Sequence, residues 1–404
     1  MNFIISFPGL KDVLVKKVEE VGEIIRIYVE MDRQENRCPK CGNKTNRIHD
    51  YRVQKVKHLK WFERKTELFY RRRRYVCTCG KRFAEANSFV ERYQRGSIEW
   101  NQAITIKAIT AKTFKEVAEA YGTSPTTVIR RFDRIAKEES HQIGPLPEVI
   151  AIDEYKGDTE EGKYQVIIAD GITREPIDIL PNRYKTTIKR YLQKHGAQVQ
   201  MVTMDMSPSF KAAVQEALGK PAIVADRFHF CRYIYWALDK VRRRVQQDFH
   251  AYDRKKCKKI KRIFYKGYDQ LSQEERWLIE RYLNLSEELE RAYRLKEAYR
   301  EWFTRAKDLG ASQIRLVKQE LEQLLERFER EGIPEMQDVI KTFKNWETEI
   351  LNSFVYNYSN GFLEGINNLT KVLKRNAFGY RNFERFRAKI LLSHRYKRIG
   401  KHIG

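Results

Sequence analysis

The chain has 404 residues, and its 79 Lys and Arg against 54 Asp and Glu give a formal net charge of +25. At about 150 residues per domain, this length predicts two to four domains with at least one sizeable hydrophobic core. The basic excess predicts a polyanionic partner, with nucleic acid first and an anionic membrane second. No apolar run approaches the roughly 18–20 residues of a membrane-spanning helix, which argues against a membrane protein.

The amino-terminal stretch Met1–Lys11 does not resemble a secretory signal, because it lacks a cationic region followed by a long apolar run. We therefore expect a soluble intracellular protein.

Two breaks in the periodic pattern divide the chain, near Phe89–Ser97 and at Gly144–Pro147, where Gly-Pro-Leu-Pro cannot continue a helix. The pattern predicts short strands before the first break, among them Ile24–Val29, and three helices between the breaks. An α/β layer, charged helices with aromatic interruptions, and an apolar helix with a basic tail are predicted to follow. The fold class is multidomain α+β, with predicted domains over residues 1–90, 98–140, 148–245, 246–350 and 354–404.

Four of the six cysteines lie close together in the sequence and predict a metal site. Cys38 and Cys41 form a knuckle in which Gly42 relieves the backbone, and Cys77 and Cys79 offer a second pair. Clustering of this kind in an intracellular chain favours metal over disulfides. Four thiolates suit structural Zn²⁺, which can stabilise a domain with a small core.

Other ligand sets remain open at this site, because His49 or His58 could replace one cysteine. The two remaining cysteines, Cys231 and Cys257, stand alone in later helical segments and are expected to be buried or idle thiols.

A run of four arginines lies between the cysteine pairs. Arg71, Arg72, Arg73 and Arg74 are flanked by tyrosines, and few acidic residues are nearby in the sequence to neutralise them. Cations beside aromatic rings suit contact with DNA phosphates. A solvated charged face is the alternative, and we predict DNA contact.

Residues 114–135 carry the pattern of a helix-turn-helix. Apolar residues at i, i+3, i+4 and i+7 predict two short helices, with Ser124 capping the second and Pro125 at its first position. An ordinary three-helix bundle has the same apolar pattern, but the basic module upstream favours DNA reading. The second helix would present polar side chains to a major groove, namely Thr126, Thr127, Arg130 and Arg131.

Apolar runs that end in aspartate mark the α/β region. Val149–Ile152 precedes Asp153 and Val199–Met204 precedes Asp205, so two buried strands are expected to deliver carboxylates at their carboxyl ends. Ligands collect at that edge of an open α/β sheet, which predicts one shared metal site. The alternative is that Asp follows strands because it starts turns.

A further strand, Ala222–Ala225, ends in Asp226, and His229 follows closely. The third carboxylate is expected to be Glu364, at the head of an amphipathic helix with an apolar stripe on its other flank. The amide and cationic side chains of this stretch suit a metal and DNA phosphates together, and they are Asn360, Asn367, Asn368, Lys371, Lys374 and Arg375.

Three acidic side chains that converge suit a pair of divalent cations, one acting on the attacking oxygen and the other on the leaving oxygen. Mg²⁺ is the natural ion, with Mn²⁺ as a substitute. Trp277, Trp302 and Trp346 in the helical region are expected to be buried core, with stacking on an extruded base as the alternative.

These motifs resemble the DDE insertion-sequence transposases, most closely the insertion sequence L-three family, over nearly the whole chain. The resemblance implies an RNase H-like core, interrupted by an all-helical insertion before the Glu364 helix. It also implies a catalytic triad of Asp153, Asp205 and Glu364. Active-site support is expected from Asp226, His229, Asn360 and Asn367.

The resemblance further implies an enzyme that binds terminal inverted repeats and cuts and joins DNA with two Mg²⁺ or Mn²⁺ ions. Terminal repeats and target DNA would be its double-stranded partners, and a homodimer or larger assembly would form on DNA in the bacterial cytoplasm, at the nucleoid. One alternative is a non-enzymatic, sequence-specific regulator derived from a transposase, for which the first 140 residues suffice. Another is a nuclease or resolvase, which cuts without joining.

Overall fold

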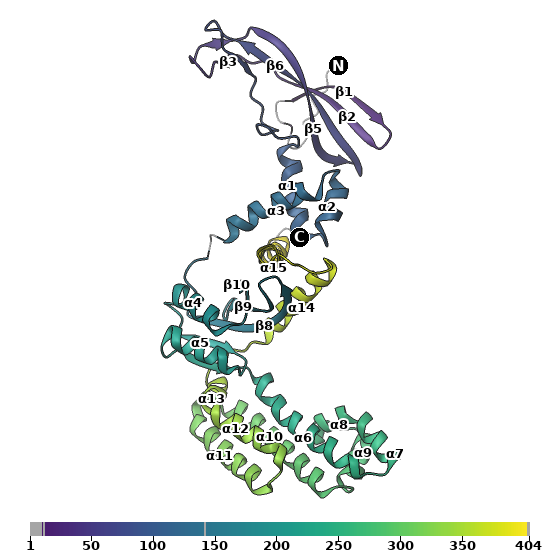
Figure 1. Cartoon of the computed structure of the whole chain (residues 1–404), viewed down its shortest axis with the longest axis vertical. Helices are drawn as coiled ribbons and strands as arrows, with labels where there is room; N and C mark the ends of the chain where they lie inside the picture. Colours follow the sequence, from purple (N-terminus) through teal and green to yellow (C-terminus); the bar gives the residue numbers. More distant parts are fainter. Residues whose placement is uncertain (1–9, 11–12, 141–142, 402–404) are drawn as a thin grey trace. The chain divides into compact units, whose positions relative to one another are not determined.

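The computed structural model describes Leu10, residues 13–140 and residues 143–401 (Figure 1). The expectation for Met1–Lys11 concerns a stretch that, Leu10 apart, lies outside the described residues. The chain divides into two compact units. One comprises Met1–Gln142, Asn376–Phe378 and Ala388–Gly404, and the other comprises Ile143–Arg375 and Gly379–Arg387.

The first unit contains β1 (Val13–Val21), β2 (Ile24–Met31), β3 (Asn36–Arg37), β4 (Lys44–Thr45), β5 (Ile48–Trp61), β6 (Arg64–Val76), β7 (Arg82–Ala84), α1 (Ile98–Thr110), α2 (Phe114–Tyr121) and α3 (Pro125–Ser140). Its main sheet has the order β1-β2-β6-β5, with β7 paired to β6, while β3 and β4 form a separate small sheet. The alternation predicted for Ile24–Val29 is confirmed, because Ile25, Ile27 and Val29 are buried.

A long antiparallel hairpin of β5 and β6 dominates this sheet (Figure 1). The prediction of short strands was wrong here, since β5 has 14 residues and β6 has 13. Leu68, Tyr70, Arg73 and Tyr75 are the buried side chains along the middle and end of β6. The buried face shifts by one residue between Tyr70 and Arg73, and Arg73 is itself a buried cation, so no regular apolar alternation in the sequence reveals the whole strand.

The three helices predicted between the breaks are present as α1, α2 and α3. Ser124 Oγ accepts the Thr127 N–H at 3.2 Å, which confirms the predicted cap, and Gly122 ends α2 in the left-handed region with φ of 61°. The apolar core of this bundle includes Phe132 and is completed by Ala388 and Leu392 from the carboxyl-terminal helix.

The break at Phe89–Ser97 does not separate compact units. Phe89 belongs to the core of the main sheet, and Ser97 Oγ lies 2.8 Å from Nδ1 of His58 on β5. The strands and the three helices therefore form one unit, and the second unit begins at Ile143, next to the break at Gly144–Pro147.

The second unit begins with β8 (Val149–Thr159), β9 (Gly162–Asp170), β10 (Pro176–Leu180), α4 (Lys185–His195), β11 (Met201–Met204), α5 (Pro208–Leu218), β12 (Ala222–Ala225) and α6 (Arg227–Val245). Its sheet has the order β10-β9-β8-β11-β12. The pairs β10/β9 and β9/β8 are antiparallel, whereas β8/β11 and β11/β12 are parallel. Apolar residues of α4 and α5 join those of the sheet in one core, as continuous apolar strands require.

Helices follow for more than a hundred residues: η1 (Gln246–Asp248), α7 (Ala251–Lys259), α8 (Lys261–Tyr265), η2 (Tyr268–Gln270), α9 (Gln273–Leu283), α10 (Glu287–Leu309), η3 (Gly310–Gln313), α11 (Ile314–Glu331), α12 (Pro334–Asn345) and α13 (Glu347–Val355). Aromatic residues of these helices pack together and against α6. Phe303 and Phe354, for example, pack with Phe230 of α6, and the rings of the three lie 5.7–6.3 Å apart. Aromatic packing therefore contributes to the core of this segment, together with buried Leu, Ile and Val side chains.

The predicted burial of the tryptophans is confirmed for Trp302 and Trp346, at 5% and 6% exposed, and wrong for Trp277, at 62%. Trp277 lies on α9, whose buried residues are Ile279 and Tyr282. The helix therefore turns Trp277 to solvent.

The chain ends with α14 (Gly361–Asn376) and α15 (Phe383–Lys401). Sequence reasoning placed residues 354–404 in one domain with a basic tail, whereas the structure assigns residues from Ala388 onward to the first unit. Lys389 is 2% exposed and donates to the backbone carbonyls of Ala108 and Ala111 at the end of α1. None of the helices in the described part of the chain has the length and apolar content of a membrane span.

Replacing Phe132 with Ala should lower the free energy of unfolding of the first unit by about 3–5 kcal/mol, because this ring is fully buried and packs on Phe114 at 5.1 Å. Denaturant unfolding would measure the loss. The control Ile106→Ala, at a side chain 43% exposed on α1, should change it by less than about 0.5 kcal/mol. Equal effects of both variants would contradict the packing described above.

Candidate functional site

Three aspartates lie side by side where the parallel strands stop pairing. Ile152 pairs with Met204, and Met204 pairs with Ala225, so the next residues are Asp153, Asp205 and Asp226 on neighbouring strands. Adjacent strands are about 4.8 Å apart, which brings the three backbones into one row. We call these three residues the acidic edge.

One detail of the expectation was wrong, because β8 does not end at Asp153. The strand continues to Thr159, since β9 remains paired with it beyond the point where β11 has stopped. Asp153 therefore occupies a strand position, whereas Asp205 and Asp226 directly follow their strands.

The carboxylate of Asp153 is held at both oxygens. Oδ1 accepts the backbone N–H of Glu154 at 2.8 Å, and Oδ2 accepts Nδ2 of Asn367 at 2.8 Å. Burial, followed by the charges of Asp205 and Asp226, raises the pKa of Asp153 to about 6 in spite of the Glu154 N–H.

Asp205 is less well satisfied. Its Oδ1 is buried and has no hydrogen-bond partner among the described residues. Burial, and then the charge of Glu154, raises the pKa of Asp205 to about 6, while Arg232 opposes the shift. A buried carboxylate oxygen without a donor is costly unless a cation approaches it.

Asp226 precedes α6 and is 8% exposed. Burial raises its pKa, and the charge of Glu364 acts in the same direction. Nε2 of His229 lies 3.7 Å from Oδ2 of Asp226. Burial, with a further contribution from Arg232, lowers the pKa of His229 to about 4, so this imidazole is neutral at pH 7.

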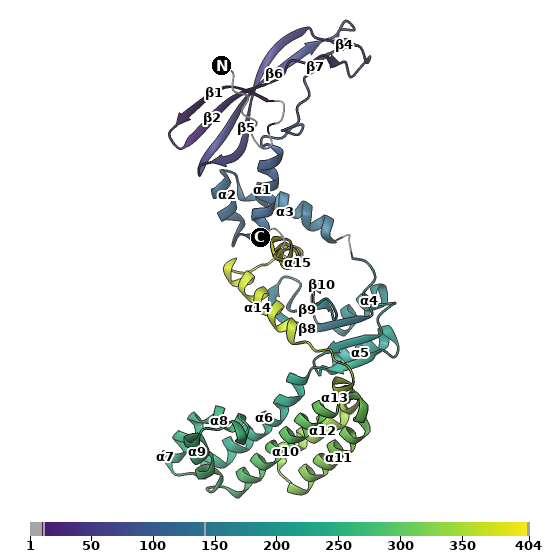
Figure 2. The same ribbon diagram turned by 180° about the vertical axis from the view of Figure 1, so that it is seen from behind.

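The residue before α14 is fixed to two strands of the sheet. Asn360 is 5% exposed; its Nδ2 donates to the carbonyl oxygen of Ile152 at 3.0 Å, and its Oδ1 accepts the Thr203 hydroxyl at 2.5 Å. Asn367, two turns along α14, then reaches Asp153. Figure 2 shows α14 beside β8, as these bonds require.

Glu364 lies between these two amides in the sequence and is exposed on the first turn of α14. Its charge contributes to the raised pKa of Asp226. In the described part of the chain, no three carboxylate or imidazole ligand atoms converge as closely as the thiols described below. Asp153, Asp205 and Glu364 are therefore not gathered as tightly as the four thiols.

Sequence reasoning missed two participants in this region, Thr203 and Arg232. Arg232 acts on Asp205, Asp226 and His229. Its position three residues after His229, one turn along α6, was the available signal.

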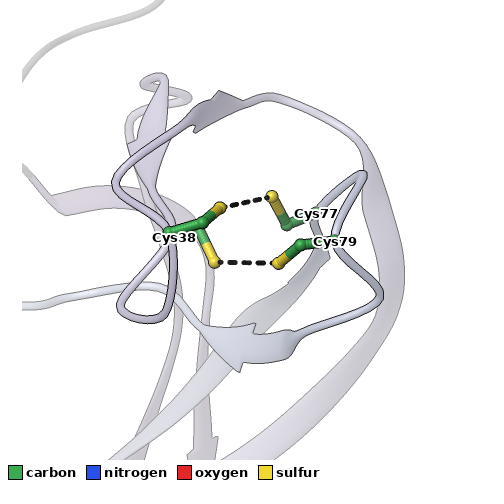
Figure 3. A group of neighbouring side chains, drawn as sticks. Cys38, Cys77 and Cys79 are labelled. Carbon is green, nitrogen blue, oxygen red and sulfur yellow. Dashed lines mark hydrogen bonds between the residues drawn. The ribbon is translucent and has the colours of Figure 1, made fainter.

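The four clustered thiols meet at one point. The sulfurs of Cys38, Cys41, Cys77 and Cys79 all lie within 4.8 Å of one another. Cys38 and Cys79 are 3.7 Å apart, and Cys41 and Cys77 are 3.5 Å apart. Figure 3 shows Cys38 and Cys79 pointing toward each other across the gap between two loops, with Cys77 beside them. Zinc–sulfur bonds of about 2.3 Å in a tetrahedron require sulfurs about 3.8 Å apart, so the arrangement fits Zn²⁺.

Backbone bonds shape both thiol loops. Gly42 N–H donates to Cys38 O and Gly80 N–H to Cys77 O, each at 2.9 Å, and both glycines have φ between 76° and 80°. An L side chain rarely adopts this conformation, which explains the glycine after each pair. The backbone N–H of Cys79 lowers the pKa of the Cys77 thiol to about 6, which favours the thiolate that binds metal.

The arginine run has acidic neighbours in space, contrary to the expectation from sequence. Arg71 pairs with Glu30 at 2.9 Å and Arg74 with Asp50 at 2.9 Å. Arg73 is 6% exposed and pairs with both Glu30 and Glu85 at 3.2 Å. Arg73 therefore stabilises the sheet, and Arg72 donates to the backbone carbonyl of Glu85.

The second helix of the helix-turn-helix presents a polar face. Thr126 and Arg130 are exposed and Thr127 is half-buried. Thr127, Arg130 and Arg131 line a hollow of about 280 Å³ together with Gln94 and Arg134. Sequence reasoning missed Arg134. The available signal was its spacing, because Arg134 follows Thr127 by seven residues and Arg130 by four, which places all three on one face of the helix. Arg131 is partly used inside the unit, with Nη2 3.4 Å from Gln94 Oε1.

The predicted cationic side chains of α14 differ in exposure and in ion pairing. Lys371 and Arg375 are exposed. Lys374 Nζ is 2.8 Å from Oδ2 of Asp158, so its charge is partly neutralised within the unit.

Comparison with known proteins gives these features a common origin. A transposase family model of the ISL3 group matches residues 150–390. The chain belongs to the ISL3 family of transposases. Two further family models match this ISL3 transposase. The zinc-finger model of the transposases IS204, IS1001, IS1096 and IS1165 matches residues 34–79, and the model of the ISL3 helix-turn-helix domain matches residues 85–136. The thiol cluster and the three helices thus belong to a zinc ribbon and a DNA-binding domain.

The chain is 26% identical to the transposase for insertion sequence element IS1001 of Bordetella parapertussis, over 95% of its own length and 96% of that protein. A shorter match, 45% identical over 58 residues, relates 14% of the chain to 19% of an ATP-dependent protease of Lactococcus lactis. This segment is too short to bear on the activity of the ISL3 transposase.

The purified ISL3 transposase should contain about one zinc per chain, and Cys77→Ser should lose it, because one tetrahedral ligand is missing. Metal analysis by mass spectrometry measures the content, and near-ultraviolet circular dichroism should report loosening of the thiol loops. Cys257→Ala, at a buried thiol of α7, is the matched control and should keep the metal. Full zinc content in Cys77→Ser would contradict the site.

Proposed function

We propose that this ISL3 transposase binds the terminal inverted repeats of its element and performs strand cleavage and strand transfer at the acidic edge. Asp153, Asp205 and Glu364 are the proposed catalytic triad. The observation that carries the proposal is the shared end of the parallel pairing at Ile152, Met204 and Ala225, with α14 attached to it through Asn360.

An RNase H-like core is part of this proposal. Its support is the sheet order β10-β9-β8-β11-β12, with two antiparallel pairs on one side of β8 and parallel strands on the other. The helices α6–α13 would then be an insertion between the last core strand, β12, and the helix that carries Glu364.

The residues at the edge fit hard divalent cations. Oxygen ligands suit Mg²⁺ or Mn²⁺, and the buried, unpartnered Oδ1 of Asp205 is a position that a cation would satisfy. Two ions about 4 Å apart do not require all carboxylates to meet at one point. When bound, the ions would supply charge neutralisation at the scissile phosphate and activation of the attacking oxygen.

The chain's own groups would position these ligands. Asn367 fixes Oδ2 of Asp153, and Asn360 fixes the start of the helix that carries Glu364. Neutral His229 would support Asp226 without adding a positive charge that competes with a cation. Lys371 and Arg375, two and three turns beyond Glu364, would hold the DNA backbone.

DNA recognition is assigned to the first unit. We propose that Cys38, Cys41, Cys77 and Cys79 bind Zn²⁺ and hold together the segments before β5 and after β6. Arg71, Arg72 and Arg74 would contact DNA phosphates. Thr126, Thr127, Arg130 and Arg131, joined by Arg134, would face the major groove. Because two element ends must be cut, a homodimer or larger assembly would form on DNA.

Asp153→Asn should reduce cleavage of a duplex spanning an element end in Mg²⁺ by at least about 10³-fold, because the ion loses a charged ligand. Denaturing gels measure strand cleavage, and joined products measure transfer. Asp338→Asn, at an exposed residue of α12, should cleave normally. Full cleavage by Asp153→Asn would overturn the assignment, and cleavage without joining by the unaltered protein would indicate a nuclease.

Arg130→Ala should weaken binding of the terminal repeat about tenfold, as expected for a contact of 1–3 kcal/mol at a base edge. Fluorescence anisotropy with repeat and scrambled duplexes measures the change. An equal loss on both duplexes would assign Arg130 to the phosphates, and no loss would remove α3 from the interface. Arg315→Ala on α11 is the control for a lost surface charge.

A further inference from the structure

The helical segment carries a basic groove that the proposed function does not use. A groove of about 860 Å³ lies between the end of α6 and α7, and of its ten lining residues six are Arg or Lys and none is Asp or Glu. Figures 1 and 2 both show α7 and α8 beside the last turns of α6. The groove therefore presents concentrated positive charge on a concave surface.

The wall of the groove is fixed by buried contacts. Arg242 is 3% exposed, and its guanidinium donates to Asp239 at 2.7 and 3.0 Å. The same guanidinium donates to Gln246 at 2.8 Å and to the carbonyl oxygen of Cys257 on α7 at 3.3 Å. These bonds tie α6 to α7, so the groove is preformed.

The positive charges that line the groove are only partly neutralised by acidic residues of the protein. Asp239 is the acidic residue against this wall, and Arg242, Arg243 and Lys261 all pair with it, so three cations share one carboxylate. On α7, Arg254, Lys255 and Lys258 are exposed, and no ion pair joins them to any other described residue. The groove thus has exposed positive charges without acidic partners in the described part of the chain, which can attract an external anion.

The spacing of these cations matches a nucleic-acid backbone. Arg254 and Lys258 are one helical turn apart, about 6 Å along α7. One strand of duplex DNA rises about 3.4 Å along the axis for each phosphate and also winds around that axis, so neighbouring phosphates lie farther apart than the rise and the two side chains can reach neighbouring phosphates. Lys255 adds a third contact beside them.

We propose that the α6–α7 groove binds the phosphate backbone of duplex DNA and is a second DNA contact surface on the second unit. The surface extends the proposed function but does not depend on the chemistry at the acidic edge. Because phosphate contacts carry no sequence information, it would hold flanking or target DNA as readily as element ends.

The test compares two full-length triple variants in an Asp153→Asn background, so that DNA stays intact without a chelator that would also remove zinc. The groove variant carries Arg254→Ala, Lys255→Ala and Lys258→Ala. The control variant carries Arg315→Ala, Arg327→Ala and Arg330→Ala, which removes the same charge from exposed positions of α11. Thermal unfolding should show equal midpoints, because all six side chains are exposed.

Affinity for a mixed-sequence duplex of about 30 base pairs is then measured against salt concentration. The groove variant should bind about tenfold more weakly near 0.1 M salt, and its log–log slope should flatten by about 2–3, since each phosphate contact contributes about 0.9. The control variant should match the parent. Equal losses in the two variants, or none in the groove variant, would overturn the proposal.

A mononucleotide offers the same phosphate chemistry. If the groove binds the duplex backbone through several phosphates, millimolar ATP at constant ionic strength should leave duplex binding unchanged. If ATP displaces the duplex from the protein with an intact groove and not from the groove variant, the groove is a nucleotide site instead. Strand cleavage by Asp153→Asn would refute the proposed catalytic residues. The affinity comparison would then be repeated without added Mg²⁺, so that the duplex stays intact, and the two proposals fail separately.

Discussion

The side chain of Asn360 makes the hydrogen bonds on which the acidic edge depends. β11 stops pairing at Met204, and Asn360 supplies a donor to the carbonyl oxygen of Ile152 and an acceptor to the Thr203 hydroxyl. Leaving a buried carbonyl unpaired costs about 1–3 kcal/mol, so these bonds favour one position for the start of α14. That position lets Asn367 reach Asp153 and brings the charge of Glu364 to Asp226. The start of α14 and strand β8, some 200 residues apart in the chain, are thereby held together at the acidic edge.

Charge of opposite sign is segregated within the ISL3 transposase. The chain as a whole carries +25, yet the acidic edge gathers carboxylates whose pKa values are raised by burial and by one another. Surplus cations lie on α3, on the outer face of α14 and in the α6–α7 groove. Arg73 shows the opposite use of a cation, since its guanidinium is enclosed by Glu30 and Glu85 and stabilises the sheet.

Local patterns predicted much of the fold, because each relied on neighbours in sequence. Continuous apolar runs located β8, β11 and β12, since strands buried on both faces have no polar alternation. Long β6 was missed because its buried face shifts by one residue between Tyr70 and Arg73, and because Arg73 is a buried cation whose counterions, Glu30 and Glu85, lie outside the strand. The exposure of Trp277 and the position of residues from Ala388 onward depend on tertiary packing that no local pattern encodes. The residues of the acidic edge could be named from sequence, but the hydrogen bond from Asn367 of α14 to Asp153 could not.

The last helix has a consequence for truncated products of the gene. Ala388 and Leu392 are buried in the core of the helix-turn-helix bundle, and Lys389 caps the carbonyls at the end of α1. A polypeptide that stopped after the third helix would expose apolar surface there and lack those bonds. An amino-terminal fragment of this kind would therefore hold its helix-turn-helix bundle less stably than the full-length chain does.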